Sequence, residues 1–196
     1  IRNVEVVREH LKDADIVHHL AGVTEVARTK EEQNAEKDKL LTEVAEVGTS
    51  IVLSETPEKC KIIFPSTHVV YEGKDTADVN IKEDFETFPV LPYSTSKDKN
   101  EKQIINSKRN YVILRLGSVY GYSNDATRLN IMPNLFSMIA SQDGTIRLFG
   151  GGKQIKTLVP LIDTDRCFKF MEEHNDIKNE IFNVTKDKVT VEEVAN

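Results

Sequence analysis

Short apolar segments alternate along the chain with longer stretches of helical periodicity. Residues 15–22, 60–65 and 111–116 are rich in β-branched side chains and end at or just before a glycine or proline, which is typical of buried strands. The stretches 26–55 and 93–107 that separate them have the spacing of helices. Because strands that alternate with helices form parallel sheets covered on both faces, we predict an α/β fold with a doubly wound parallel sheet.

The first helical stretch, 26–55, is highly charged and carries one apolar face. Gly48 interrupts this pattern at a cost of about 1 kcal/mol relative to alanine. We therefore expect Gly48 to pack closely against a neighbouring element. The apolar residues of the stretch are Leu40, Leu41, Val44, Val47, Ile51 and Val52.

Beyond Gly121 the pattern is looser, although strands and helices still alternate. The glycine run at 150–152 lacks the spacing of a Walker-type phosphate loop, so we reject that interpretation. The elements predicted here are a helix over 131–140, a strand over 145–149, a helix capped by Asp163 that ends near Glu173, a strand over 180–184 and a final helix capped by Thr190.

Composition restricts the class of function. A net charge of −6 disfavours nucleic acid and anionic membranes as partners. No apolar run has the roughly 18 residues of a membrane span, and no secretory signal opens the chain. Cys60 and Cys167 are isolated, as expected of reduced thiols in a cytoplasmic protein. His18 and His19 would point to opposite faces of a strand, so we predict no metal site.

Three polar residues have the chemistry of a proton-transfer device. Tyr93 and Lys97 are four residues apart, on one face of a predicted helix, and Thr67 follows a predicted strand. A nearby ammonium favours phenolate and lowers the pKa of a tyrosine. Such a tyrosine can exchange a proton with a substrate hydroxyl while a cofactor exchanges hydride. Since this spacing also arises by chance, its context decides the interpretation.

Five motifs supply that context, in order along the chain. They are DIVHHLAG at 15–22, FPSTHVVYEG at 64–73, PYSTSK at 92–97, LRLGSVYG at 114–121, and FGGGKQ at 149–154 followed by VPLID at 159–163. Together they resemble the extended short-chain dehydrogenase/reductase family, specifically its nucleotide-sugar epimerase/dehydratase branch. The resemblance covers nearly all of the chain.

The resemblance implies a Rossmann-like fold that lacks its N-terminal strands. The glycine-rich GxxGxxG turn of the family, which binds pyrophosphate, occurs nowhere in this sequence, so we expect a fragment of a longer chain. By the same resemblance, residues 1–122 are a partial dinucleotide-binding domain. Residues 123–196 are part of a smaller substrate-binding lobe, with the strand at 180–184 returning to the main sheet.

The resemblance also assigns roles to particular residues. Thr67 holds the reacting hydroxyl, Tyr93 is the general base and acid, and Lys97 binds the nicotinamide ribose and lowers the pKa of Tyr93. The remaining implied contacts are Leu20, Ala21, Gly22 and Gly117, together with Tyr93 and Lys97, for the dinucleotide, and Ser118, Asn134 and Arg147, together with Thr67, for the nucleotide-sugar. A surface arginine and a polar residue near a helix start are equally good readings of Arg147 and Asn134.

Departures from the family pattern narrow the chemistry. His68 and Val69 stand where the 4,6-dehydratases have Asp-Glu, so the acid and base of dehydration are missing. Ala45, Ser118 and Pro160 replace a frequent Asn, Asn and His, which weakens any assignment to a particular sugar.

We therefore expect an NAD(P)-dependent epimerase or reductase that acts on a nucleotide-activated sugar, with NAD slightly favoured over NADP. One alternative is a non-catalytic module of the same fold that binds a nucleotide or a partner. Another is an enzyme that reduces a free carbonyl compound. The family commonly dimerises through two helices, which here would be those near 26–58 and 93–108, so a homodimer is expected.

Overall fold

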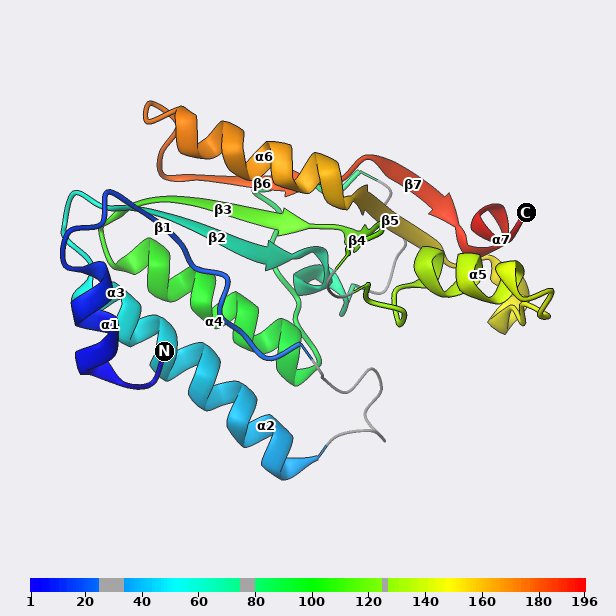
Figure 1. Ribbon diagram of the computed structural model, residues 1–196, viewed down its shortest axis with the longest axis horizontal. Helices are drawn as coiled ribbons and strands as arrows, with labels where there is room; N and C mark the ends of the chain where they lie inside the picture. Colours follow the sequence, from blue (N-terminus) through cyan, green and yellow to red (C-terminus); the bar gives the residue numbers. More distant parts are fainter. Residues whose placement is uncertain (25–33, 75–79, 125–126) are drawn as a thin grey trace. The chain divides into compact units, whose positions relative to one another are not determined.

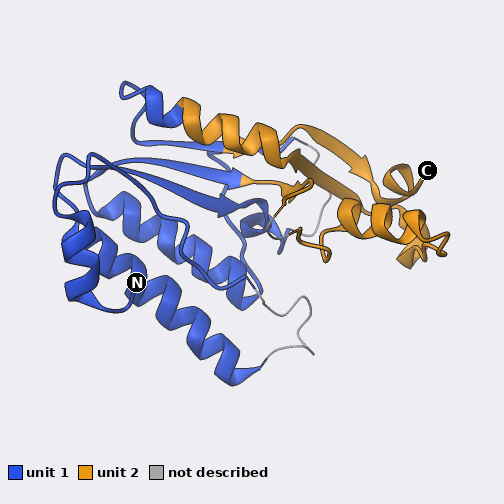
Figure 2. Cartoon of the chain, in the orientation of Figure 1, with its two compact units in different colours: residues 1–115, 171–182 blue, residues 116–170, 183–196 orange. Residues whose placement is uncertain are grey.

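The computed structural model describes residues 1–24, 34–74, 80–124 and 127–196 of the chain. These residues form two compact units, each built from two segments of the sequence (Figure 2). Unit 1 comprises Ile1–Arg115 and Met171–Phe182, and unit 2 comprises Leu116–Phe170 and Asn183–Asn196. The domain boundary predicted between residues 122 and 123 stays a prediction.

A four-stranded sheet lies at the centre of unit 1, with the strand order β1-β2-β3-β6. Its strands are β1 (Ile16–His18), β2 (Lys61–Thr67), β3 (Asn110–Leu116) and β6 (Glu180–Val184). β1 pairs with β2 in parallel, with Val17 opposite Ile62, and β2 and β3 run in the same direction in Figure 1. The predicted α/β fold with a Rossmann-like parallel sheet is confirmed.

The middle of β2 is buried on both faces of the sheet. Ile62, Ile63 and Phe64 are almost completely inaccessible to solvent. A strand covered on both sides has a continuous apolar run rather than an alternating one. This explains why the middle of β2 has apolar side chains on both faces.

Unit 1 also contains helices and helical turns. They are α1 (Val4–Leu11), α2 (Ala35–Thr42), the π-helix η2 (Glu43–Val47), α3 (Gly48–Glu55), the 3-10 turn η3 (His68–Tyr71) and α4 (Pro92–Asn106). α4 packs against β2 and against the continuous helical stretch 35–55, and Figure 1 shows α3 and α4 on the same side of the sheet. The helix predicted over 26–55 is confirmed for 35–55, and residues 26–33 lie outside the described residues.

Gly48 is buried within this helical stretch, directly after the π-helical turn. A Cβ atom at Gly48 would lie 3.2 Å from three side-chain atoms of Ile1. The expected close packing at Gly48 is therefore confirmed, and the absence of a side chain lets the N-terminal residue approach the helix.

The helix α1 was not predicted from the sequence. Its N-cap is Asn3, whose side-chain oxygen accepts hydrogen bonds from the backbone N–H groups of Glu5 (3.1 Å) and Val6 (3.3 Å). Asn is among the preferred residues at this position because it satisfies otherwise unpaired helix donors. Only Val7 of α1 is buried.

The core of unit 1 lies between the sheet and these helices. Cys60 is part of it and is fully buried, and this burial raises the pKa of its thiol above the ordinary value. Cys60 therefore packs as a small apolar side chain in the core of unit 1. The buried core residues are Val7, Val17, Val52, Cys60, Ile62, Phe64, Ile104 and Ile113.

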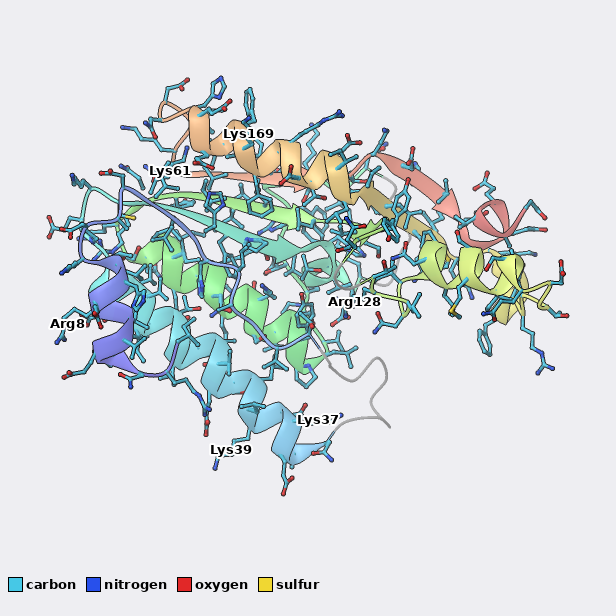
Figure 3. All side chains as sticks on the ribbon, viewed as in Figure 1. Arg8, Lys37, Lys39, Lys61, Arg128 and Lys169 are labelled. Carbon is cyan, nitrogen blue, oxygen red and sulfur yellow. The ribbon has the colours of Figure 1, made fainter. Side chains whose placement is uncertain are left out.

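Lys61, at the start of β2, caps the carboxyl end of α6 (Leu161–Glu173) within unit 1 (labelled in Figure 3). Its ammonium donates to the carbonyls of Met171 (2.6 Å) and His174 (2.8 Å). The last carbonyls of a helix lack partners inside it, and a cation at a helix C-terminus also interacts favourably with the helix dipole.

Unit 2 contains a three-stranded sheet with the order β4-β5-β7. Its strands are β4 (Ser118–Tyr120), β5 (Ile155–Pro160) and β7 (Asp187–Thr190), and its further helical elements are α5 (Met132–Ser141), the 3-10 turn η4 (Phe149–Gly152) and α7 (Val191–Ala195). β5 pairs in parallel with β4 and antiparallel with β7. The helix predicted over 131–140 is confirmed by α5, and the one capped by Thr190 by α7.

Two predictions for unit 2 are wrong. Residues 145–148 are not a strand, and the chain turns into η4 at Phe149. The glycines at 150–152 have φ angles of 57°, 68° and 70°, a left-handed conformation that ends an extended chain. α6 begins at Leu161, so Asp163 lies in its first turn and is not its cap. Asp163 there accepts from Lys186 (3.1 Å).

Among the described helices, none combines the length and the apolar character needed to cross a bilayer.

Candidate active site

Thr67 is the last residue of β2 and stands where that strand turns into η3. Its backbone is extended, and its side-chain oxygen accepts a hydrogen bond from the N–H of Val69 (3.4 Å), which makes Thr67 the N-cap of the turn. The residue is buried. The fold therefore holds the hydroxyl of Thr67 at the carboxyl end of a central parallel strand, the edge at which open α/β sheets bind ligands.

Tyr93 lies in the first turn of α4, which begins at Pro92. Proline suits this position because it lacks the N–H that a first helical residue cannot use. The side chain of Glu72, in the segment after η3, fixes the helix start. Its Oε1 accepts from the N–H groups of Val90 (2.9 Å) and Leu91 (2.7 Å) and from the hydroxyl of Ser94.

Lys97 lies one helical turn after Tyr93. Its Nζ is 6.0 Å from the centroid of the Tyr93 ring and 4.5 Å from that of Phe64. The ammonium donates a hydrogen bond to the carbonyl of Pro65 (2.7 Å), two residues before Thr67 in β2. The structure thus brings Lys97 both to Tyr93 and to the strand end that carries Thr67, within unit 1. The catalytic roles of these three residues stay predictions.

Burial lowers the pKa of the Lys97 ammonium to about 8, and the negative charge of Glu101 acts in the opposite direction. Desolvation disfavours the charged form of a lysine, whereas a nearby carboxylate favours it. Lys97 is therefore poised to lose its charge a little above neutral pH.

The loop at Leu20, Ala21 and Gly22 follows the carboxyl end of β1 and is exposed at Leu20 and Ala21. Leu20 leaves 63% of its surface open to solvent, which is unusual for a large apolar side chain. The N–H of His19 donates to the carbonyl of Ile63 (2.9 Å), so the start of the loop is held beside β2. The predicted dinucleotide contacts of this loop stay predictions.

His19, directly after β1, is buried. Its Nε2 is 2.7 Å from the hydroxyl of Thr49 in α3, and its ring lies 5.5 Å from the ring of Phe64. Phe64 in turn lies under the ammonium of Lys97. Burial, together with the positive charge of Lys97, lowers the pKa of His19 to about 4, so this ring is neutral near pH 7.

Acidification should weaken the folded state through His19. The pKa of His19 is about 4 in the folded state, against the ordinary histidine value of 6.5. Between these two pH values, His19 is therefore protonated in the unfolded chain and neutral in the folded one. The contribution of His19 is complete above pH 6.5 and falls as the pH drops toward 4, by up to roughly 3 kcal/mol. Urea unfolding at about pH 4.5 and about pH 7 measures it, with His19→Gln as the test and His10→Gln, on α1, as the control. Equal pH dependence in the parent and in His19→Gln would contradict this expectation.

The side chains that surround Lys97, namely His19, Phe64 and Glu101, received no role from the sequence. Two of them left a signal that could have been used. Glu101 follows Lys97 by four residues, which places both on one helix face. His19 follows His18 at the end of a strand, so one of the two had to point inward. The position of Phe64 under Lys97 depends on tertiary packing.

Gly117 and Ser118 belong to unit 2, where backbone geometry accounts for the glycine. A Cβ atom at Gly117 would lie 2.9 Å from the carbonyl oxygen of Thr157 in β5, and the N–H of Gly117 donates to the carbonyl of Val184 (2.9 Å). Ser118 begins β4 and pairs with Leu158. Close backbone approach thus explains Gly117 without a ligand, and the predicted ligand contacts of both residues stay predictions.

Asn134 and Arg147 also belong to unit 2. The side chain of Asn134 accepts from the N–H of Gly121 (3.0 Å) and donates to the carbonyl of Arg128 (3.0 Å), so it organises the segment before α5. Arg147 lies in the irregular segment before η4. Hydrogen bonding within the unit thus accounts for Asn134, and the nucleotide-sugar contacts predicted for both residues stay predictions.

Within the described ranges, no group of three His, Cys, Asp or Glu side chains has an arrangement that could hold a metal ion. His18 lies 3.5 Å from the carboxylate of Glu172, whereas His19 points to the buried Thr49. The two adjacent histidines therefore have different surroundings.

Solved structures with the same fold include three sugar-nucleotide epimerases. UDP-glucose 4-epimerase of Thermotoga maritima, solved with UDP-glucose, matches with a TM-score of 0.84 and 21% identity over 99% of this chain and 63% of that chain. UDP-glucuronic acid 4-epimerase of Bacillus cereus, solved with UDP-glucuronic acid and NAD, matches with a TM-score of 0.80 and 23% identity over 96% of this chain and 60% of that chain. UDP-glucose 4-epimerase of Thermus thermophilus, solved with NAD, has a TM-score of 0.80 and 21% identity over 99% of this chain and 64% of that chain.

The chain thus spans less than two thirds of the length of these structures. No curated protein sequence matches it. The family model described as "NAD dependent epimerase/dehydratase family" matches residues 1–185, which is nearly the whole chain. The chain therefore belongs to the NAD-dependent epimerase/dehydratase family.

Proposed function

We propose that this protein is an NAD(P)-dependent epimerase or reductase that acts on a nucleotide-activated sugar. The observation that carries the proposal is the position of the Lys97 ammonium, 6.0 Å from the Tyr93 ring and hydrogen-bonded to β2 two residues before Thr67. Family membership supports the same class of chemistry. So do the solved structures, which include epimerases crystallised with UDP-sugars or NAD.

In this proposal, Tyr93 takes the proton from a ring hydroxyl of the sugar. The ammonium of Lys97 favours the phenolate form of Tyr93 by its positive charge, and the hydroxyl of Thr67 donates a hydrogen bond to the same sugar oxygen. A bound NAD(P) supplies the group that accepts hydride from the carbon and returns it. Tyr93 then gives the proton back to the oxygen. The product would be an epimer if hydride returned to the opposite face of the carbon. If the starting sugar is already a ketone, the reaction is a reduction, in which NAD(P)H would supply the hydride and the phenol of Tyr93 would give its proton to the ketone oxygen.

The residues present fit the nicotinamide end of the cofactor. An ammonium has three N–H donors, and the carbonyl of Pro65 takes one from Lys97, so Lys97 can also donate to a ribose hydroxyl. The loop from Leu20 to Gly22 lies at the carboxyl end of a parallel strand, where dinucleotides bind in doubly wound folds. Among the described residues, none has an atom within 4 Å of the place of a Cβ at Gly22, which leaves room for a ligand on their side.

A homodimer through the two long helical stretches is part of the proposal. The described part of the first, 35–55, packs beside α4 within unit 1. Leu40 and Val47 on the first stretch, and Ile105 on α4, are apolar and exposed. In the proposed dimer, a second copy would cover these side chains. Light scattering after size-exclusion chromatography measures the mass of the assembly.

Ligand-induced stabilisation of the full-length gene product tests the proposed function. We expect NAD or NADP, and a UDP-sugar, each to raise the melting temperature by several degrees. A ligand at about 100 times its Kd stabilises the folded state by about 2.7 kcal/mol. Free glucose at the same concentration is the matched control, since it lacks the nucleotide.

The other outcomes distinguish the alternatives. If no nucleotide or nucleotide-sugar shifts the melting temperature of the full-length gene product, the non-catalytic module is favoured and the proposed enzyme is wrong. If NADPH stabilises the protein and no nucleotide-sugar does, reduction of a free carbonyl compound is favoured.

A further inference from the structure

A buried ion pair lies beside the candidate active site, entirely within unit 1. Arg115, near the end of β3, and Glu101, on α4, are 5% and 2% exposed. The guanidinium holds the carboxylate with Nη2 2.7 Å from Oε2 and Nε 3.1 Å from Oε1. A bidentate pair of this kind fixes the geometry of both side chains as well as their separation.

The same two groups connect to the strand end and to the turn that follows it. The hydroxyl of Ser66, the residue before Thr67, donates to Oε1 of Glu101. Nη1 of Arg115 donates to the hydroxyl of Tyr71, the last residue of η3, and to the carbonyl of Glu83 (3.0 Å). Ser66 and Tyr71 flank Thr67 in the sequence, so the ion pair holds the segment on both sides of it.

Glu101 also faces Lys97 from the next turn of α4. Its negative charge favours the ammonium form of Lys97 and offsets part of the cost of burial. Of the described titratable residues, Tyr93 on the same helix and His19 directly after β1 also lie near this ammonium.

We propose that Glu101 and Arg115 are a positioning pair for the reaction, which together fix the Thr67 segment against α4, and that the carboxylate of Glu101 keeps the ammonium of Lys97 charged. The inference rests on the proposed function, because it assigns a task to these residues within that site. A buried ion pair adds little net stability by comparison with apolar side chains of the same volume, so stability is a weak reason for this pair to stand there. Neither residue touches the substrate in this proposal, and both act through Thr67 and Lys97.

Ser66→Ala tests the link to Thr67 while leaving both charges in place. We expect kcat to fall about tenfold, with KM within about twofold, because a small displacement of a reacting group has a large effect on rate. Thr56→Val is the matched control. It removes another buried hydroxyl of unit 1, one that donates to helix carbonyls, and should leave kcat unchanged. A Ser66→Ala protein that melts at a lower temperature but keeps its kcat would overturn the positioning role of this link.

Glu101→Gln tests the effect on Lys97. We expect the pKa of Lys97 to fall, because the variant loses a negative charge and leaves that of Arg115 uncompensated. The 13Cε resonance of Lys97, assigned with Lys97→Arg, reports its titration, and the alkaline limb of kcat should move to lower pH with it. A Lys97 titration that is the same in Glu101→Gln as in the parent would overturn the electrostatic role.

The two proposals fail in different ways. A parent protein without turnover or nucleotide binding would contradict the proposed function, whereas the NMR titration of Lys97 still decides the role of Glu101. If Glu101→Gln does not fold, the parent titration is compared with that of Ser66→Ala, which keeps the carboxylate. Because Ser66→Ala keeps the carboxylate of Glu101, we expect the pKa of Lys97 to be the same in this variant as in the parent. A difference between the two as large as the difference between about 8 and the ordinary lysine value of 10.5 would overturn the assignment to Glu101.

Discussion

Tyr93→Phe should lower kcat by at least about a thousandfold and leave the affinity for NAD(P) within about twofold. The substitution removes a single oxygen, the one that would exchange the proton with the sugar hydroxyl. Since Lys97 and the loop from Leu20 to Gly22 are untouched, the other groups proposed to bind the cofactor remain. Steady-state kinetics with a UDP-sugar measures the loss of turnover, and the melting temperature with saturating NAD reports the retained binding.

Tyr111→Phe is the matched control for this experiment. Tyr111 is the second residue of β3 and packs against the core of unit 1. We expect it to keep the parental kcat, so that a loss specific to Tyr93 reports on chemistry. Turnover by Tyr93→Phe at the parental rate would show that this phenol does not carry the proton.

The parts of the fold that the sequence predicted are those specified by local signals. Residues 61–67 and 110–116 form strands because runs of apolar side chains, with β-branched and aromatic residues among them, suit a sheet covered on both faces. α4 begins at Pro92, one residue before the predicted start, because proline is well suited to a first helical position. The proximity of Tyr93 and Lys97 then follows from helical geometry alone.

The features that the sequence did not predict depend on partners far away in the chain. β5 was missed because its neighbours, β4 and β7, come from separate segments on either side of it in the sequence. The strand predicted over 145–149 does not form, and the left-handed conformation of the glycines that follow turns the chain there. Arg115 stands within an apolar run, and nothing in that run identifies Glu101 as its partner. The candidate site was therefore predicted as a set of residue types, whereas the network that supports it required the structure.

Arg115→Met should lower the free energy of unfolding by about 3–5 kcal/mol, because it leaves the buried carboxylate of Glu101 without its cation. Methionine occupies a similar volume, so the loss reports on charge and hydrogen bonding more than on a cavity. The hydroxyl of Tyr71 and the carbonyl of Glu83 also lose their donor. Urea unfolding measures the change, and an unchanged m-value would show that the extent of unfolding is the same.

The double variant Glu101→Met with Arg115→Met decides whether uncompensated charge is the cause. Removing both members of a buried ion pair avoids the cost of burying a lone charge, and well-packed apolar replacements are often neutral. We therefore expect the double variant to be more stable than Arg115→Met alone, although the hydroxyls of Ser66 and Tyr71 lose their partners in it. Lys102→Met with Asp98→Met removes a neighbouring ion pair on α4 whose lysine is exposed. For this control pair, the change in unfolding free energy of the double variant should differ much less from the sum of the two single changes. If the double variant at 101 and 115 is less stable than Arg115→Met, the uncompensated carboxylate of Glu101 is not the cause of the loss in Arg115→Met. The packing of the two long side chains is then what stabilises this part of unit 1.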